Sequence, residues 1–192
     1  MSTAQERREK SVEEFKRKFR TVFPLPQQLS GLFYRIGDIY TDAAKMYAIA
    51  YYILEQIDDA YRAEAPVDKN TRTALMYQLH KLEDYRERVY EGYEAWLPYF
   101  VDWDYLERTK PPDSELPRLA LEVLDSLEDL RGKIEELRKR VETKERFTQD
   151  ELDLARDIYD DASIPVLHLS RLAYWDIVRF LQWLYPELFQ SK

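Results

Sequence analysis

Acidic side chains at helical spacing come closest to a catalytic pattern in this chain. Glu91 and Glu94 are three residues apart, and so are Glu122 and Asp125. Residues three apart share one face of a helix, and carboxylates on two neighbouring helices can hold Mg²⁺ and activate a bound water. The chemistry that this pattern favours is metal-assisted hydrolysis.

These four carboxylates are similar in spacing to the Mg-binding acids of all-α nucleotide pyrophosphohydrolases, and only these four residues carry the resemblance. It implies a metal-dependent nucleotide pyrophosphohydrolase as the alternative function. If Val89 and Val123 occupy core positions of a heptad, however, all four carboxylates face away from the core. The chain has 37 acidic residues, so two such pairs are expected by chance. We favour solvated helix faces, and we assign no catalytic residue, no metal and no cofactor.

The remaining ionisable groups give weaker patterns. Neither His80 nor His168 has a glutamate three positions before it, which excludes a ferritin-like di-iron site. The pairs Asp58-Asp59 and Asp160-Asp161 lack the third aspartate of prenyl-transferring enzymes. There is no cysteine, so thiol catalysis, thiolate metal sites and disulfides are excluded. We expect His80 to pair with an acid on the surface, and His168 to be packed or solvated in the first turn of the last helix.

Most of the chain shows apolar residues at alternating spacings of three and four, which is typical of long amphipathic helices. The first stripe covers residues 29–57, and its helix should end before Pro66. The second covers residues 75–100, with Asn70 or Thr71 as its cap. These two stripes predict a pair of helices joined by a short loop.

A third stripe covers residues 116–141. Thr148 and Glu151 then form a capping box that opens a short helix to about Ala162. Ser163 and Pro165 are expected to restart the chain. The core positions predicted for the last helix are Val166, Ser170, Ala173, Ile177, Phe180 and Leu184.

Long helices joined by short loops are usually antiparallel neighbours. The sequence therefore predicts an all-α fold, an up-down bundle of four long helices with heptad seams, plus an N-terminal amphipathic helical arm. The bundle should cover residues 27–192, and the arm with its proline linker residues 1–26. An extended coiled-coil hairpin completed by a second chain is the other architecture that fits.

Arg86 occupies a predicted core position that is otherwise apolar. A buried guanidinium needs a partner, and such a residue can fix the register of a bundle. Alternatively, its apolar stem can carry the charge to the bundle edge. We favour the second interpretation.

The charge of the chain is unevenly divided. Residues 1–23 carry a net charge of +3 and the rest of the chain −11. A basic arm can contact nucleic-acid phosphates, dock on an acidic neighbour or lie on an anionic membrane, although its i,i+4 ion pairs also fit an ordinary solvated helix. Phe15, Phe19 and Phe23 need burial somewhere, which favours docking or binding. The predicted nucleic-acid-binding residues are Arg7, Arg8, Lys16, Arg17, Lys18 and Arg20.

Aromatic residues gather near the C-terminus, where six occur within residues 174–189. One helix face cannot bury all of them. They either close the core against the arm or form a self-association surface, because aromatics are enriched at interface cores. Both interpretations stay open, and the residues assigned to self-association are Trp175, Trp183 and Phe189.

The pI of about 5.0 excludes a globally basic nucleic-acid binder. The first 20 residues lack the apolar run of a secretory signal, and the longest apolar run is too short for a bilayer. We predict a non-enzymatic assembly protein, cytoplasmic or in a virion, that forms a homo-oligomer or joins a larger complex, with nucleic acid as a further partner of the arm. This organisation is similar to that of small helical subunits of RNA-guided complexes and coat proteins of filamentous archaeal viruses, although no motif of either is present.

Overall fold

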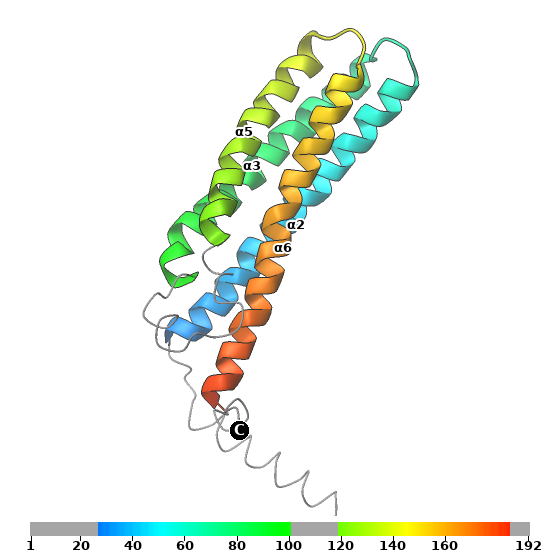
Figure 1. The fold of residues 1–192 in the computed structure, drawn as a ribbon. Coiled ribbons are helices and arrows are strands. Elements are labelled where there is room, and N and C mark those ends of the chain that lie inside the picture. The colour runs from blue at the N-terminus through cyan, green and yellow to red at the C-terminus, as the bar shows by residue number, and fades with distance from the viewer. Residues whose placement is uncertain (1–26, 101–118, 185–192) are drawn as a thin grey trace, which may run out of the picture.

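Four long helices make up the described part of the chain, which is residues 27–100 and 119–184 of a computed structural model. Side chains are described for residues 36–95 and 119–173. Each helix packs against two others in the cyclic order α2, α3, α5, α6 (Figure 1). The helices are α2 (Gln27–Arg62), α3 (Lys69–Phe100), α5 (Leu119–Thr143) and α6 (Gln149–Leu184). The all-α class with four packed helices is confirmed for this part, whereas the arm of residues 1–26 lies outside it.

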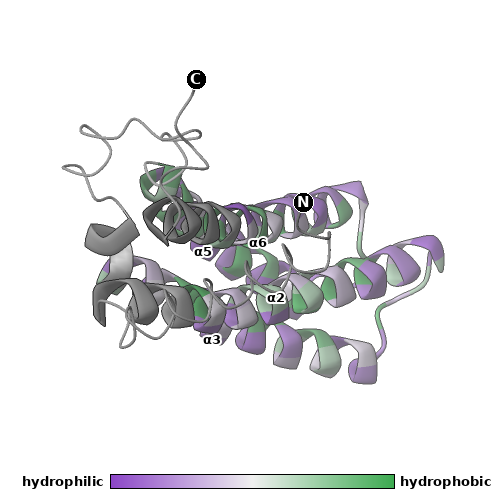
Figure 2. Ribbon diagram, turned by 90° about the horizontal axis from the view of Figure 1, so that it is seen from below, coloured by the Kyte–Doolittle hydropathy of each residue, from purple (hydrophilic) through white to green (hydrophobic). Residues whose placement is uncertain are grey.

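One apolar face of each helix forms the core. Hydrophobic and hydrophilic residues alternate around the helices, as Figure 2 shows. In the first three stripes, every residue expected at the core is buried wherever its side chain is described, from Ile36 to Val141. The largest fully buried side chains are Tyr93, Ile36, Met46, Ile53, Ile57, Leu75, Leu79, Leu82, Leu127, Leu130 and Ile134.

The expected break in the last part of the chain is wrong, because α6 is one continuous helix with Pro165 inside it. A proline in a helix interior removes one backbone hydrogen bond and costs about 3 kcal/mol. Pro165 is itself buried, and Ala162 and Leu169 on either side of it are fully buried in the core. Packing on both sides of the proline therefore offsets the lost hydrogen bond and keeps the helix intact.

The core face predicted for this helix is also wrong where side chains are described, while Ile177, Phe180 and Leu184 lie beyond the described side chains. Ser170 is exposed, and Val166 and Ala173 are only half-buried. Leu169 and Leu172 lie in the core instead. A new helix beginning at Pro165 would turn a different set of residues toward the core. In the continuous helix, the buried face keeps the spacing of three and four residues that begins at Leu152.

The two short connections meet at one end of the bundle (Figure 1). The Val67 amide donates to the Glu145 carbonyl at 2.8 Å. Arg72, in the first turn of α3, donates to the Val141 carbonyl and to that of Lys144, where the end of α5 leaves carbonyls without helical partners. The cap of α3 is Asp68, not Asn70 or Thr71, because its carboxylate accepts from the amides of both. These bonds fasten the α2–α3 pair to the α5–α6 pair.

The Glu151 half of the predicted capping box is confirmed at the start of α6. The Thr148 amide and hydroxyl both donate to the Glu151 carboxylate, at 2.8 and 2.7 Å. Glu151 is fully buried, and Arg140 donates to its other oxygen at 3.1 Å. Burial alone would raise the pKa of Glu151, but Thr148, Arg140 and Lys144 together hold that pKa below its ordinary value of 4.5.

We expect the bundle to lose stability as the pH falls below about 4.5. A carboxyl whose pKa is lower in the folded chain stabilises the fold above its unfolded pKa, and this contribution disappears as the pH falls through the folded pKa. Asp68 acts in the same direction, because the Thr71 hydroxyl and amide lower its pKa. Thermal melts should show a falling Tm across this range, with a shallower fall for Glu151→Gln. An equally steep fall in that variant would show that Glu151 contributes nothing to it.

Candidate interaction surface

A groove runs between α5 and α6, and we call it the α5–α6 groove. Its volume is about 330 Å³, and its lining is mostly apolar. Val123 and His168 lie buried at its base, while Ile164 and Leu167 form the α6 rim. The lining residues are Leu119, Glu122, Val123, Ser126, Ile164, Leu167, His168 and Arg171.

The α6 rim exposes two large apolar side chains. Leu167 is 62% exposed and Ile164 is 37% exposed. Leu121 on α5 is 49% exposed but does not line the groove. Since it stands two residues before Val123, it lies on the opposite side of α5. The chain thus offers two exposed leucines, one on the groove and one remote from it.

A polar pair crosses the core behind the groove. A hydrogen bond of 2.7 Å joins the Tyr93 hydroxyl on α3 to His168 Nδ1 on α6. Burial raises the pKa of the Tyr93 hydroxyl well above 10.0, so the phenol is neutral. His168 lies near the middle of α6 and is buried, so its expected place in a first turn is wrong. The pair fixes α6 against the helix diagonally opposite and thereby sets the position of the α6 rim.

Acidic side chains continue the same face of α5 and α6 beyond the groove. Lys133 Nζ donates to Asp161 Oδ2 at 2.6 Å, and this bond raises the lysine pKa, with smaller contributions from Asp157 and Asp129. Asp129 stands three residues after Ser126 on α5, and Asp161 stands three residues before Ile164 on α6. Residues three apart share a helix face, so both aspartates lie along the seam, the line where α5 and α6 meet on the outside of the bundle. Three carboxylates therefore face one ammonium, which leaves an excess of negative charge.

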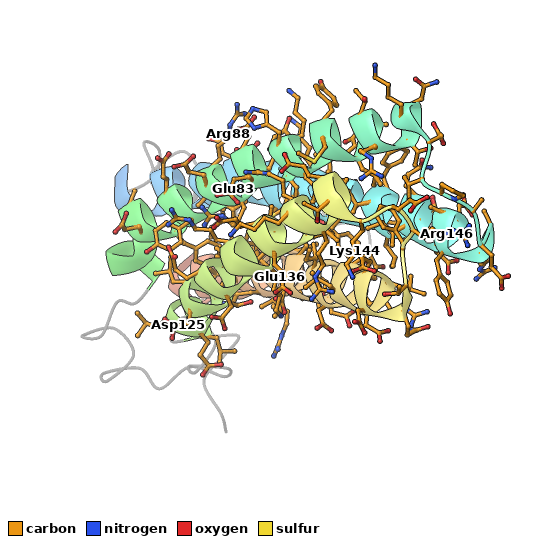
Figure 3. All side chains as sticks on the ribbon, turned by 90° about the horizontal axis from the view of Figure 1, so that it is seen from above. Glu83, Arg88, Asp125, Glu136, Lys144 and Arg146 are labelled. Atoms are coloured by element: carbon orange, nitrogen blue, oxygen red, sulfur yellow. The ribbon has the colours of Figure 1, made fainter. Side chains whose placement is uncertain are left out.

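The predicted carboxylate pairs lie on the outside of the bundle. Glu91, Glu94, Glu122 and Asp125 are all exposed, and Glu122 alone lines the α5–α6 groove. Asp125 lies near the start of α5, at the other end of that helix from Lys144 (Figure 3). Among the described side chains, residues 36–95 and 119–173, no group of three or more histidine and acidic residues is placed to hold a metal ion.

Arg86 is buried rather than extended to the bundle edge, so the interpretation that we favoured is wrong. The residue is 4% exposed. Its guanidinium donates to both oxygens of Glu83, at 2.8 and 3.0 Å, and more weakly to the Leu127 carbonyl of α5 at 3.4 Å. The charge is therefore paired within α3 and tied to the neighbouring helix. His80, by contrast, lies on the surface near Asp84, as expected.

The other predicted site residues lie outside the described side chains. The six basic residues of the arm belong to residues 1–26, and Phe189 follows the end of α6. Trp175 and Trp183 belong to the α6 backbone, but their side chains fall beyond residue 173. The α5–α6 groove is the surface that the sequence did not indicate. A continuous phase through Pro165 would have placed Ile164 and Leu167 outside the core and so pointed to it.

Comparison with known proteins adds no relative. No family model, no curated protein and no solved structure matches the chain. None of the helices in the described part is long and apolar enough to cross a membrane.

Proposed function

We propose that this chain is a non-enzymatic helical assembly protein that binds copies of itself through the α5–α6 groove. The bundle is the scaffold, with heptad seams along its helices, and the cytoplasm or a virion is where such a subunit would assemble. The observation that carries the proposal is the exposure of Leu167 and Ile164 beside an apolar groove.

These side chains are not needed to complete the core. The core is already lined by fully buried residues of all four helices, while Leu167 stays largely in water. Full burial of one leucine is worth about 1.5–3 kcal/mol, so association over this rim gains free energy. Apolar side chains gathered at a groove with a polar surround are typical of protein-binding surfaces.

The test compares the same substitution, leucine to aspartate, at two exposed positions. Leu167→Asp places a charge on the groove rim, and Leu121→Asp places the same charge on the opposite side of α5. We expect Leu167→Asp to weaken self-association at least about tenfold, because a rim charge would have to be desolvated. Leu121→Asp should associate like the parent protein. Equal effects of the two substitutions on the mass in solution would contradict the proposal.

The arm supports a more specific version, a nucleoprotein subunit. If Arg7, Arg8, Lys16, Arg17, Lys18 and Arg20 contact phosphates, the affinity for nucleic acid must fall as salt rises. Six contacts on duplex DNA give a slope of about −5 for log affinity against log salt. Fluorescence titrations at several salt concentrations measure this slope. Absence of binding even at low salt would leave assembly through protein contacts alone.

The alternative, a metal-dependent nucleotide pyrophosphohydrolase, makes the opposite prediction. It requires release of pyrophosphate from a nucleoside triphosphate in the presence of Mg²⁺, and loss of that activity in Glu122→Gln. The assembly proposal expects no such activity in the parent protein. Turnover that Glu122→Gln abolishes would reverse the choice between them.

A further inference from the structure

We infer that the α5–α6 groove binds the basic N-terminal arm of a second copy of this chain. The inference rests on the proposed self-assembly and names the segment that performs it. The arm would lie along the seam between the two helices, with its apolar face on the groove and its basic residues toward the acidic side chains beyond it.

The arm has an apolar face short enough to lie along the seam. Val12, Phe15, Phe19 and Val22 follow one another at spacings of three, four and three, so they share one face of a helix. A helix of residues 12–22 is about 16 Å long. The seam from Leu119 to Lys133 measures about 21 Å by the same rise, so the segment fits along it. This is the geometry of an amphipathic helix bound in an apolar groove.

The charges are complementary as well. Residues 119–133 of α5 hold four acidic and two basic side chains, and of these two Arg131 lies near Glu128 while Lys133 pairs with Asp161. Arg171 is the one basic residue of the groove lining. Asp129, Asp157 and Asp161 all lie close enough to Lys133 to act on it electrostatically, and one ammonium offsets one of the three. The arm carries a net charge of +3, with Lys16, Arg17, Lys18 and Arg20 beside its phenylalanines. A basic helix on this seam would thus place its cations near unneutralised carboxylates.

The length of the linker favours a second copy over the same chain. The Tyr47 and Tyr159 hydroxyls contact each other, which sets α2 against α6. Gln27 lies about 30 Å along α2 from Tyr47, and His168 lies about 14 Å along α6 from Tyr159, in the same direction. Measured along the bundle axis, Gln27 and His168 are therefore about 16 Å apart.

Within one chain, the arm would have to bridge that gap and also pass around α6. The four steps from Phe23 to Gln27 span at most about 14 Å, and a helical turn from Phe23 to Phe19 adds about 6 Å. The path needs about 16 Å along the axis and a further 10 Å or so across α6. The straight distance is about 19 Å against a reach of about 20 Å, so the chain would have to be fully extended while also passing around α6, whereas the arm of a neighbouring copy has no such restriction.

An arm on one copy and a groove on the next make a head-to-tail contact. Such a contact uses two different surfaces, so each added copy presents a fresh groove and a fresh arm. Assembly then has no fixed size unless the rotation between copies closes a ring. This property separates the inference from a symmetric dimer.

A mixing experiment with two full-length variants tests it. One is Leu167→Asp, with an intact arm. The other is the double substitution Phe15→Ser and Phe19→Ser, with an intact groove. Each is expected to be monomeric alone, and helical content measured by circular dichroism confirms that each is folded. Mixed together, they should form a one-to-one complex that does not grow, because one intact arm meets one intact groove. Leu121→Asp, as the control, should assemble like the parent protein.

Each outcome bears on a different claim. If the parent protein assembles and the double arm variant assembles equally well, the arm is not the occupant, although self-assembly stands. If the two variants stay monomeric on mixing, the pairing of arm with groove is overturned. If the parent protein itself stays monomeric at every concentration, the proposed function fails. Equal disruption by Leu121→Asp and Leu167→Asp would reject the groove as the binding surface.

Discussion

Leu127→Ala should lower the free energy of unfolding by about 2–5 kcal/mol, the range for a buried leucine truncated to alanine. Leu127 is 1% exposed at the middle of α5, in a core shared by all four helices. The substitution removes the transfer free energy of the side chain and leaves a cavity that the surrounding helices fill only in part. Urea unfolding followed by circular dichroism measures the change.

Leu121→Ala is the matched control, because Leu121 is the same residue type on the same helix and is 49% exposed. We expect it to change the free energy of unfolding by less than about 0.5 kcal/mol, as for a surface substitution. The slope of free energy against urea should be unchanged in both variants, so that the midpoints report stability. Similar losses in the two variants would show that the core face of α5 is misplaced.

Glu83→Ala should cost about 3 kcal/mol, the low end of the range for a buried ion pair that loses one partner. The substitution leaves the Arg86 guanidinium, whose side chain is 5% exposed, without its carboxylate. Glu83 itself is 25% exposed, so water can reach part of the vacated site and reduce the penalty. Thermal and urea unfolding give this value.

Arg86→Met separates the charge from the packing. It removes the buried charge while keeping an apolar stem of similar length, and such replacements are often neutral or stabilising. We expect a change within about 1 kcal/mol, and the double variant with Glu83→Ala should resemble Arg86→Met alone. If Arg86→Met costs as much as Glu83→Ala, the guanidinium has a favourable role of its own, such as its bond to the Leu127 carbonyl.

The sequence predicted the first three helices because their spacing is uninterrupted from Ile36 to Val141 wherever the chain is described. The prediction of a helix break at Pro165 is wrong, because the low helix propensity of proline does not include the packing around it. Proline disfavours a helix interior, but the burial of Ala162 and Leu169 is a tertiary effect that local propensity does not contain. The spacing of Leu152, Ala155, Ile158 and Ala162 with Leu169 and Leu172 was the available signal of one continuous helix.

The candidate surface was harder to predict than the fold. Ile164 and Leu167 were indistinguishable from core residues until the phase of α6 was known. The buried charge of Arg86 was also misjudged, because its bidentate contact with Glu83 depends on how the two side chains turn together under α5. The Glu151 half of the capping box with Thr148 was predictable, since it depends only on residues three apart.

The central claim is that this chain assembles with copies of itself, and the mass of the full-length protein in solution tests it most directly. Sedimentation velocity should follow that mass from about 1 μM to about 100 μM, a range that detects micromolar association. We expect the average mass to rise with concentration above the 23.2 kDa of one chain, without a fixed ceiling unless the copies close into a ring. A mass that stays at 23.2 kDa throughout would contradict the account.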